Sequence, residues 1–138
     1  MVISNIYCII ALLEIFQKSL TMTQTRSTNL DYLNEITGGE SEITKEFIQL
    51  FFDQLPEFRN GMNNLLAEKK WKELGELAHK AKSSVMTFGM DDLGHKLKEL
   101  QLKTQKLQDI DKYPKYVEEF MKQMAVAEAE LKDDMLKL

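Results

Sequence analysis

Residues 71–89 read WKELGELAHKAKSSVMTFG, and their apolar residues recur at three- and four-residue spacings. This period is typical of a helix that turns one side towards a hydrophobic core. Gly89 follows the last apolar residue and suits the end of such a helix. The residues on the predicted core side are Leu74, Ala78, Ala81, Val85 and Phe88.

The same period continues on both sides of this helix. Upstream it runs through residues 43–68, where Pro56 removes one backbone donor and predicts a bend without a break. Downstream it covers residues 93–110, and it returns over residues 117–135 after Pro114, which suits a first helical turn. Short connections between such helices favour antiparallel neighbours.

A shorter amphipathic turn, from Leu30 to Ile36, precedes these helices and ends at Gly38-Gly39, and Ser41 offers an N-cap to the next helix. The chain is therefore predicted to be all-α: an antiparallel up-down four-helix bundle with a short extra N-terminal helix. The predicted core residues outside 71–89 include Ile43, Phe47, Leu50, Phe51, Phe58, Met62 and Leu65, then Leu93, Leu97, Leu100, Leu107 and Ile110.

The composition excludes several classes of function. The 138 residues fit one globular domain, and a single cysteine provides neither a disulfide framework nor a cysteine-based zinc site. A formal net charge of −4 argues against nucleic acid as a partner, because binding phosphates requires a clustered basic surface. The expected partners are proteins.

The first 29 residues stand apart from the helical pattern, so we predict an N-terminal extension, 1–29, before a helical domain, 30–138. Residues 2–16 are mostly apolar but fall short of the ~20 apolar residues of a membrane span. They also lack the basic lead of a secretory signal, which favours a cytoplasmic protein without membrane association. Three interpretations stay open: an extra packed helix, an imperfect membrane tether, or non-native or disordered sequence upstream of a true start at Met22. We favour the last.

The helix over residues 71–89 also carries the candidate chemistry. His79 lies about 140° from the core side at 100° per residue, so its imidazole is expected to be exposed. Lys82 and Ser83 occupy the next turn on the same side, and Gly75 is expected to leave open space beside the ring. An exposed imidazole with a nearby cation and small neighbours suits phosphoryl transfer, which needs mainly in-line positioning and charge compensation. No acid completes a hydrolytic triad with His79 and Ser83.

The run AHKAKSSVMTFG at residues 78–89 resembles the signature of histidine-containing phosphotransfer (HPt) domains, roughly H-x-L-K-G-S with a later glycine. Upstream, residues 47–57 resemble the second helix of that family, and the resemblance extends over about residues 30–136. Two positions depart from the pattern: Ala81 replaces the usual leucine and Ser83 replaces the usual glycine. Ala81 stays apolar, whereas Ser83 adds a hydroxyl near the reactive nitrogen.

The resemblance implies a phosphorelay function. His79 would accept a phosphoryl group from the aspartyl phosphate of a receiver domain and pass it to another receiver. Lys82 would steady the phosphoryl oxygens, Ser83 would permit close approach, and Gly89 would end the helix. The implied partners are receiver domains of response regulators and hybrid sensor kinases, and Mg²⁺ would belong to the receiver, with no cofactor on this chain. The chain would then be a monomeric phosphotransfer protein rather than a self-sufficient enzyme.

An exposed apolar rim around His79 is expected to receive the receiver, because contiguous exposed apolar patches usually mark interfaces. Several of its candidates could equally be core residues. The alternative function is a helical bundle that binds or sequesters a receiver without being phosphorylated, and the presence of both His79 and Lys82 argues against it. The rim candidates are Gly75, Met86, Ile48, Phe52 and Leu55.

His95 offers a comparison within the same chain. It too has a lysine three residues later, but Glu99 follows at the fourth position, where a phosphoryl group would require open space and positive potential. We therefore interpret His95 as a surface residue. A metal- or cofactor-binding bundle is disfavoured, because the pattern places no inward-facing histidine beside acidic partners.

Overall fold

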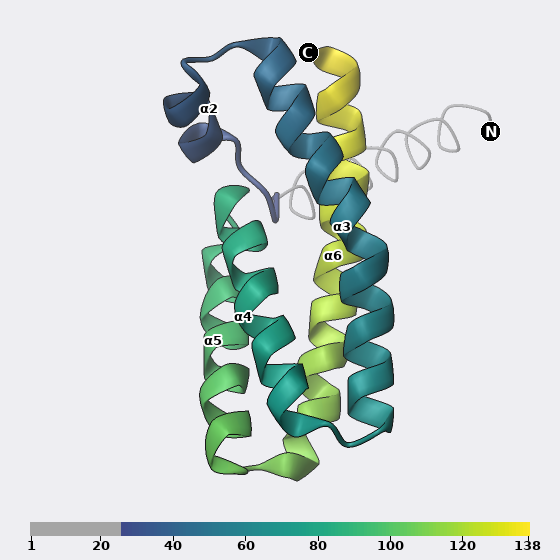
Figure 1. Cartoon of the computed structure of the whole chain (residues 1–138). Coiled ribbons are helices and arrows are strands. Elements are labelled where there is room, and N and C mark those ends of the chain that lie inside the picture. The colour runs from purple at the N-terminus through teal and green to yellow at the C-terminus, as the bar shows by residue number, and fades with distance from the viewer. Residues whose placement is uncertain (1–25) are drawn as a thin grey trace, which may run out of the picture.

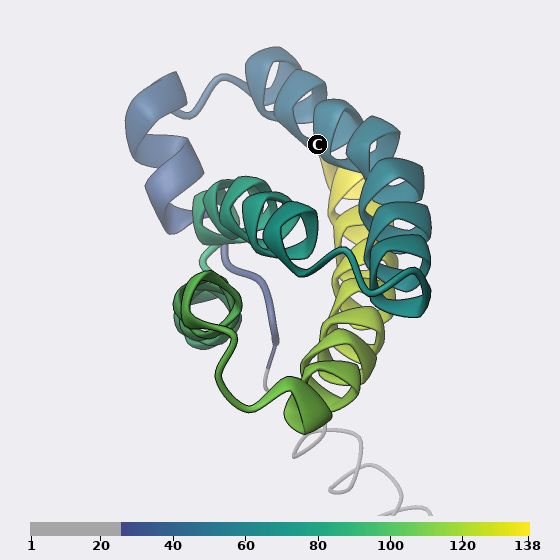
Figure 2. The same cartoon turned by 60° about the horizontal axis from the view of Figure 1, so that its bottom comes forward.

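The computed structural model describes residues 26–138, and antiparallel helices account for most of them. Figure 1 shows α3 to α6 alternating in direction along one bundle, with the short α2 at the end where α3 begins and α6 finishes. In Figure 2, α4 lies between α3 and α5. The predicted antiparallel four-helix bundle with a short extra N-terminal helix is confirmed. The elements are α2 (Asp31–Thr37), α3 (Ser41–Ala67), α4 (Trp71–Thr87), α5 (Asp91–Lys106), the 3-10 turn η1 (Ile110–Lys112) and α6 (Tyr113–Lys137).

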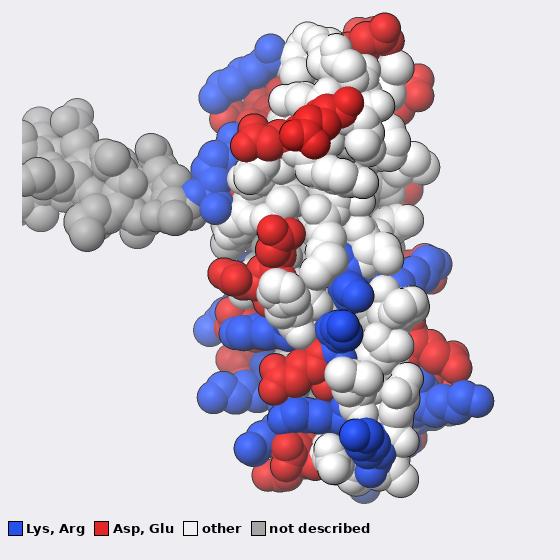
Figure 3. Space-filling view, turned by 90° about the vertical axis from the view of Figure 1, so that its left-hand side faces the viewer, with Lys and Arg blue, Asp and Glu red and all other residues white. Residues whose placement is uncertain are grey.

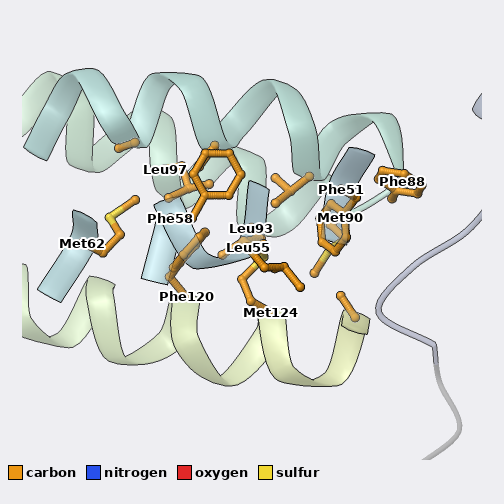
Figure 4. Close-up of a cluster of buried hydrophobic side chains, with 14 of the residues drawn as sticks. Phe51, Leu55, Phe58, Met62, Phe88, Met90, Leu93, Leu97, Phe120 and Met124 are labelled. Atoms are coloured by element: carbon orange, nitrogen blue, oxygen red, sulfur yellow. The ribbon is translucent and has the colours of Figure 1, made fainter. Parts of the chain in front are cut away.

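The hydrophobic core runs along the shared interior of α3, α4, α5 and α6. Phe58 of α3 is fully buried and meets Phe120 of α6 edge to face, with 6.4 Å between the ring centres. Near the other end, Phe51 meets Phe88 in the same way at 5.0 Å. Figure 4 shows these rings together with leucine and methionine side chains that fill the space between the helices. Edge-to-face pairs of this kind stabilise a core beyond the area that they bury.

The core side of α3 differs from the predicted one. Ile48 and Leu55 are buried, whereas Leu50 is 57% exposed and Ile43 is 36% exposed. Apolar residues cover a wide arc of α3, so their presence alone does not select the sector that faces inward. The buried positions are spaced alternately by four and three residues, which keeps a single stripe aligned with the bundle. They are Thr44, Ile48, Phe51, Leu55, Phe58 and Met62.

Helix ends account for the other differences. Ser41 is the first residue of α3 rather than its N-cap; Glu40 occupies the cap without a side-chain hydrogen bond. α5 ends just before Leu107, which adopts a left-handed conformation with a φ of 52°. Leu107 and Ile110 therefore leave the core line and are 59% and 39% exposed. Pro56 lies inside an unbroken α3, so the helix continues through it as predicted.

Residues 26–30 form a non-helical segment, the N-terminal strap, that is fixed to α6 by polar contacts. The Arg26 guanidinium pairs with Asp134, with 2.9 Å between Nη1 and Oδ1. The backbone N–H of Thr28 donates to Glu130 at 2.9 Å, and its hydroxyl donates to the same oxygen at 2.7 Å. Thr28 is only 1% exposed. The strap is therefore part of the packed unit.

These contacts bear on the predicted boundary between residues 29 and 30. They join residues 26–28 to α6, whereas the division of the chain into an extension, 1–29, and a helical domain, 30–138, stays a prediction. A short polar segment has no apolar period, and this is why the pattern did not include it. Residues 1–25, with the apolar stretch 2–16 and the expected start at Met22, lie outside the described residues. None of the helices within residues 26–138 is long and apolar enough to cross a membrane.

Replacing Phe58 with alanine tests the core. We expect F58A to lower the free energy of unfolding by about 3–5 kcal/mol, because it removes a fully buried ring and leaves a cavity. L50A, on the same helix but at a 57% exposed position, should cost less than about 1 kcal/mol. Urea denaturation followed by circular dichroism measures both changes. Equal losses in the two variants would contradict the assigned core side of α3.

Candidate functional site

α4 ends in a turn that depends on glycine and also holds the N-terminal strap. Gly89 has a φ of 76°, and the N–H groups of Gly89 and Met90 donate to carbonyl oxygens of the last helical turn, both at 3.0 Å. This is the Schellman arrangement, so Gly89 ends the helix as predicted. The Asn29 N–H donates to the Phe88 carbonyl at 2.8 Å, and a Cβ on Gly89 would lie 3.0 Å from Asn29. A glycine is therefore needed at position 89, both for the positive φ and because Asn29 leaves little room for a side chain.

The two sides of α4 have opposite environments. Leu74, Ala78, Ala81 and Val85 are fully buried, which confirms the predicted core side. His79 is exposed on the other side. Burial of one side of an amphipathic helix determines which residues remain in solvent, so packing of the core presents the imidazole outwards.

Among the partners that residues 26–138 offer, the His79 ring has one hydrogen-bond partner, supplied by α5. Its Nδ1 lies 3.1 Å from Oε1 of Gln101. An amide oxygen can only accept, so this bond requires the proton on Nδ1 and leaves the lone pair on Nε2. With the amide oxygen of Gln101 towards Nδ1, the ring is oriented by α5, and Nε2 is the nitrogen that can act as a nucleophile.

Sequence reasoning missed Gln101 because it belongs to a different helix, although a signal was present. α4 and α5 are antiparallel and joined by a turn at Gly89-Met90. Residues equally far from that turn lie at the same height, and His79 and Gln101 are each eleven positions from Met90. Folding the two helical patterns about the turn therefore places Gln101 opposite His79.

Two lysines near His79 differ in their pairing. Lys80 forms an ion pair with Glu57 of α3, with 2.7 Å between Nζ and Oε1. Lys82 is partly exposed and takes part in none of the ion pairs formed within residues 26–138. It lies one turn beyond His79 on the same side of α4. Its ammonium group is therefore available to an anionic group brought to the imidazole.

Ser83 is exposed and borders two hollows on the surface. One, of about 470 Å³, lies between α2 and α4 and is also lined by Tyr32, Glu35 and Met86. The other, of about 230 Å³, lies between α3 and α4 and includes the exposed Leu50. The surface is therefore hollowed on both sides of α4, one turn beyond His79.

Only some of the residues predicted to form the apolar rim lie at the surface. Met86 and Phe52 are partly exposed. Ile48 and Leu55 are 0% and 3% exposed, so their assignment to a docking rim is wrong: they belong to the core stripe of α3. Leu50, which was expected inside, is the exposed apolar residue of that helix beside the α4 surface.

Gly75 lies where α4 packs against α5. It is buried, and a Cβ built on it would lie 2.1 Å from Oγ1 of Thr104. It also lines, with Gln101 and Thr104, a hollow of about 400 Å³ between α4 and α5, so its interpretation as open space beside the ring stays a prediction. Its small size serves the contact between α4 and α5.

Charge on one side of the molecule is mixed (Figure 3). Figure 3 shows one side of the molecule, where basic and acidic side chains alternate and uncharged surface separates them. Within residues 26–138, no group of three or more His, Cys, Asp or Glu side chains is arranged to hold a metal ion. His95 is exposed on α5, in agreement with its interpretation as a surface residue.

The sequence was also compared with known proteins. It matches the model of the Hpt domain family over residues 46–135, from the first turns of α3 to the last turns of α6. The chain belongs to the Hpt domain family. The match is shorter than the predicted 30–136 and leaves out α2 and the N-terminal strap. No curated protein and no solved structure matches the chain.

Membership of this family indicates the general chemistry of the site. Hpt domains are phosphotransfer modules of two-component signalling and interact with receiver domains in phosphorelays. The matched region contains His79, Lys82, Ser83 and Gln101.

Proposed function

We propose that this Hpt domain carries phosphoryl groups on His79 between receiver domains. The supporting observation is an exposed imidazole whose Nδ1 is held by Gln101 at 3.1 Å, which leaves Nε2 as the nucleophile. Nε2 attacks the phosphorus of an aspartyl phosphate, a nitrogen–phosphorus bond forms, and the bond from phosphorus to the aspartate oxygen breaks. The freed carboxylate stays on the first receiver. The reverse steps with a second receiver return the imidazole to its starting state.

Lys82 and Ser83 have separate roles in this proposal. The ammonium group of Lys82 approaches the equatorial oxygens of the phosphoryl group, where transfer chemistry needs positive charge. Ser83 is small enough to allow a receiver to close on the ring. Mg²⁺ and the acceptor aspartate belong to the receiver, so catalysis is shared between two proteins and this chain is not an enzyme by itself.

The receiver is proposed to dock on the surface around His79. Met86 and Phe52 remain members of the docking rim because both are partly exposed, and Leu50 joins them. The hollow that Ser83 shares with Leu50 offers a contact for an apolar side chain of the receiver. We further propose that the protein acts as a cytoplasmic monomer, which leaves this surface free for one receiver at a time.

Transfer of label from a phosphorylated receiver tests the acceptor residue. We expect the wild-type protein to gain acid-labile phosphate, and H79Q to gain none, because glutamine has no nucleophilic ring nitrogen. H95Q is the matched control, since it removes the other histidine and should label as fast as the wild type. Full labelling of H79Q would contradict the proposal. Binding of the receiver with no labelling of any variant would favour the sequestering bundle instead.

Exchange of each lysine for alanine tests the role of charge. We expect K82A to slow transfer about tenfold or more, because a hydrogen bond to a charged group contributes about 1.5–3 kcal/mol. K80A should change the rate by less than about twofold, because an exposed ion pair such as that of Lys80 with Glu57 contributes little. Rapid-quench kinetics with a phosphorylated receiver measures both rates. Equal effects of the two substitutions would remove the special role of Lys82.

A further inference from the structure

α4 and α5 come unusually close at two glycines. A Cβ on Gly75 of α4 would lie 2.1 Å from Oγ1 and 3.2 Å from Cβ of Thr104. One on Gly94 of α5 would lie 2.6 Å from Cε of Met86. Glycine in a helix interior is unfavourable relative to alanine, so a buried glycine at these positions needs a packing reason. The reason here is the short separation of the two helices.

The contact at Gly75 involves the same backbone that carries Gln101. The Thr104 hydroxyl donates to the Gln101 carbonyl oxygen at 2.7 Å, and a Cβ on Gly75 would lie 3.5 Å from that oxygen. Gly75 is one turn before His79 on α4, and Gln101 is the residue whose amide holds the ring. The contact of Gly75 with Thr104 and the hydrogen bond to the imidazole are thus adjacent.

We propose that Gly75 is a positioning residue that sets which ring nitrogen of His79 reacts. The absence of a side chain at position 75, opposite Thr104, lets α5 pack near enough for Gln101 to accept the Nδ1 proton. A side chain at position 75 must push Thr104 away and carry Gln101 with it. The hydrogen bond of 3.1 Å then exceeds normal length, and the tautomer with the proton on Nε2, which has no lone pair there, becomes populated. The expected effect on phosphoryl transfer rests on the proposed function, whereas the geometry of Gly75, Thr104 and Gln101 does not.

The G75A variant tests the proposal through the imidazole itself. Nitrogen-15 NMR of the His79 ring distinguishes a protonated nitrogen from an unprotonated one, so it reports the tautomer directly. We expect the wild type to carry its proton on Nδ1, and we expect both G75A and Q101A to shift towards the other tautomer. Transfer from a phosphorylated receiver should slow about fivefold, the factor expected for loss of one ordinary hydrogen bond.

G61A is the matched control. It is the same substitution, and its new Cβ would lie 2.5 Å from Cδ2 of Leu77 on α4. That contact belongs to the interface of α3 with α4, and the tip of a leucine side chain can move aside. G61A is therefore expected to leave both the His79 tautomer and the transfer rate unchanged. A shift of equal size in G61A would show a general effect of packing and would overturn the specific role of Gly75.

A second substitution is expected to reverse the effect of G75A on the His79 tautomer. G75A/T104A removes the Oγ1 atom, which is the nearest obstacle, so the next contact is at 3.2 Å and the wild-type tautomer should return. T104A alone should keep that tautomer, because it does not widen the interface. If G75A does not fold, T104I can be measured in its place, since it enlarges the side chain that faces Gly75. A folded G75A or T104I with the wild-type tautomer overturns the inference.

The two proposals fail separately. A wild-type tautomer in G75A while His79 still accepts phosphate rejects only the positioning role. A shifted tautomer in a protein whose His79 never accepts phosphate rejects only the relay.

Discussion

The close contact of α4 with α5 is the constraint on which the site depends. Burial of the core side of α4 forces His79 into solvent, and the short separation of the helices brings Gln101 to the ring at 3.1 Å. Exposure and orientation of the imidazole therefore have one origin. A nucleophile on a helix needs both, because an exposed ring without a partner would rotate and exchange its proton between the two nitrogens.

The remaining elements support that pair of helices. α3 and α6 provide the aromatic contacts of the core, and α3 also supplies Glu57, which pairs with Lys80 and leaves Lys82 as the nearby cation for chemistry. The N-terminal strap joins the end of α4 to α6 through hydrogen bonds at both ends. The strap and α2 lie outside the residues matched to the family, yet α2 lines a hollow beside Ser83. α2 therefore borders the candidate docking surface.

Features that depend on one helix could be predicted from the sequence, and features that depend on two could not. The exposure of His79 followed from the period of its own helix. Gln101 could be found only by folding two helices about their turn, and the contact of Gly75 needed the distance between them. Ile48 was misplaced for a third reason, because α3 is apolar over an arc too wide for composition to choose the buried sector. The pattern of one helix predicts which way a side chain points, whereas the partner of that side chain depends on contacts between helices.

The most direct measurement is the position of the phosphate on the phosphorylated protein. Phosphorus and nitrogen-15 NMR of His79, after incubation with a phosphorylated receiver, identifies the ring nitrogen that is bonded to phosphorus. A Gln101 amide that accepts the Nδ1 proton predicts phosphate on Nε2, with Nδ1 still protonated and held. Phosphate on Nδ1, or on a residue other than His79, would contradict the assignment of this surface as the relay site.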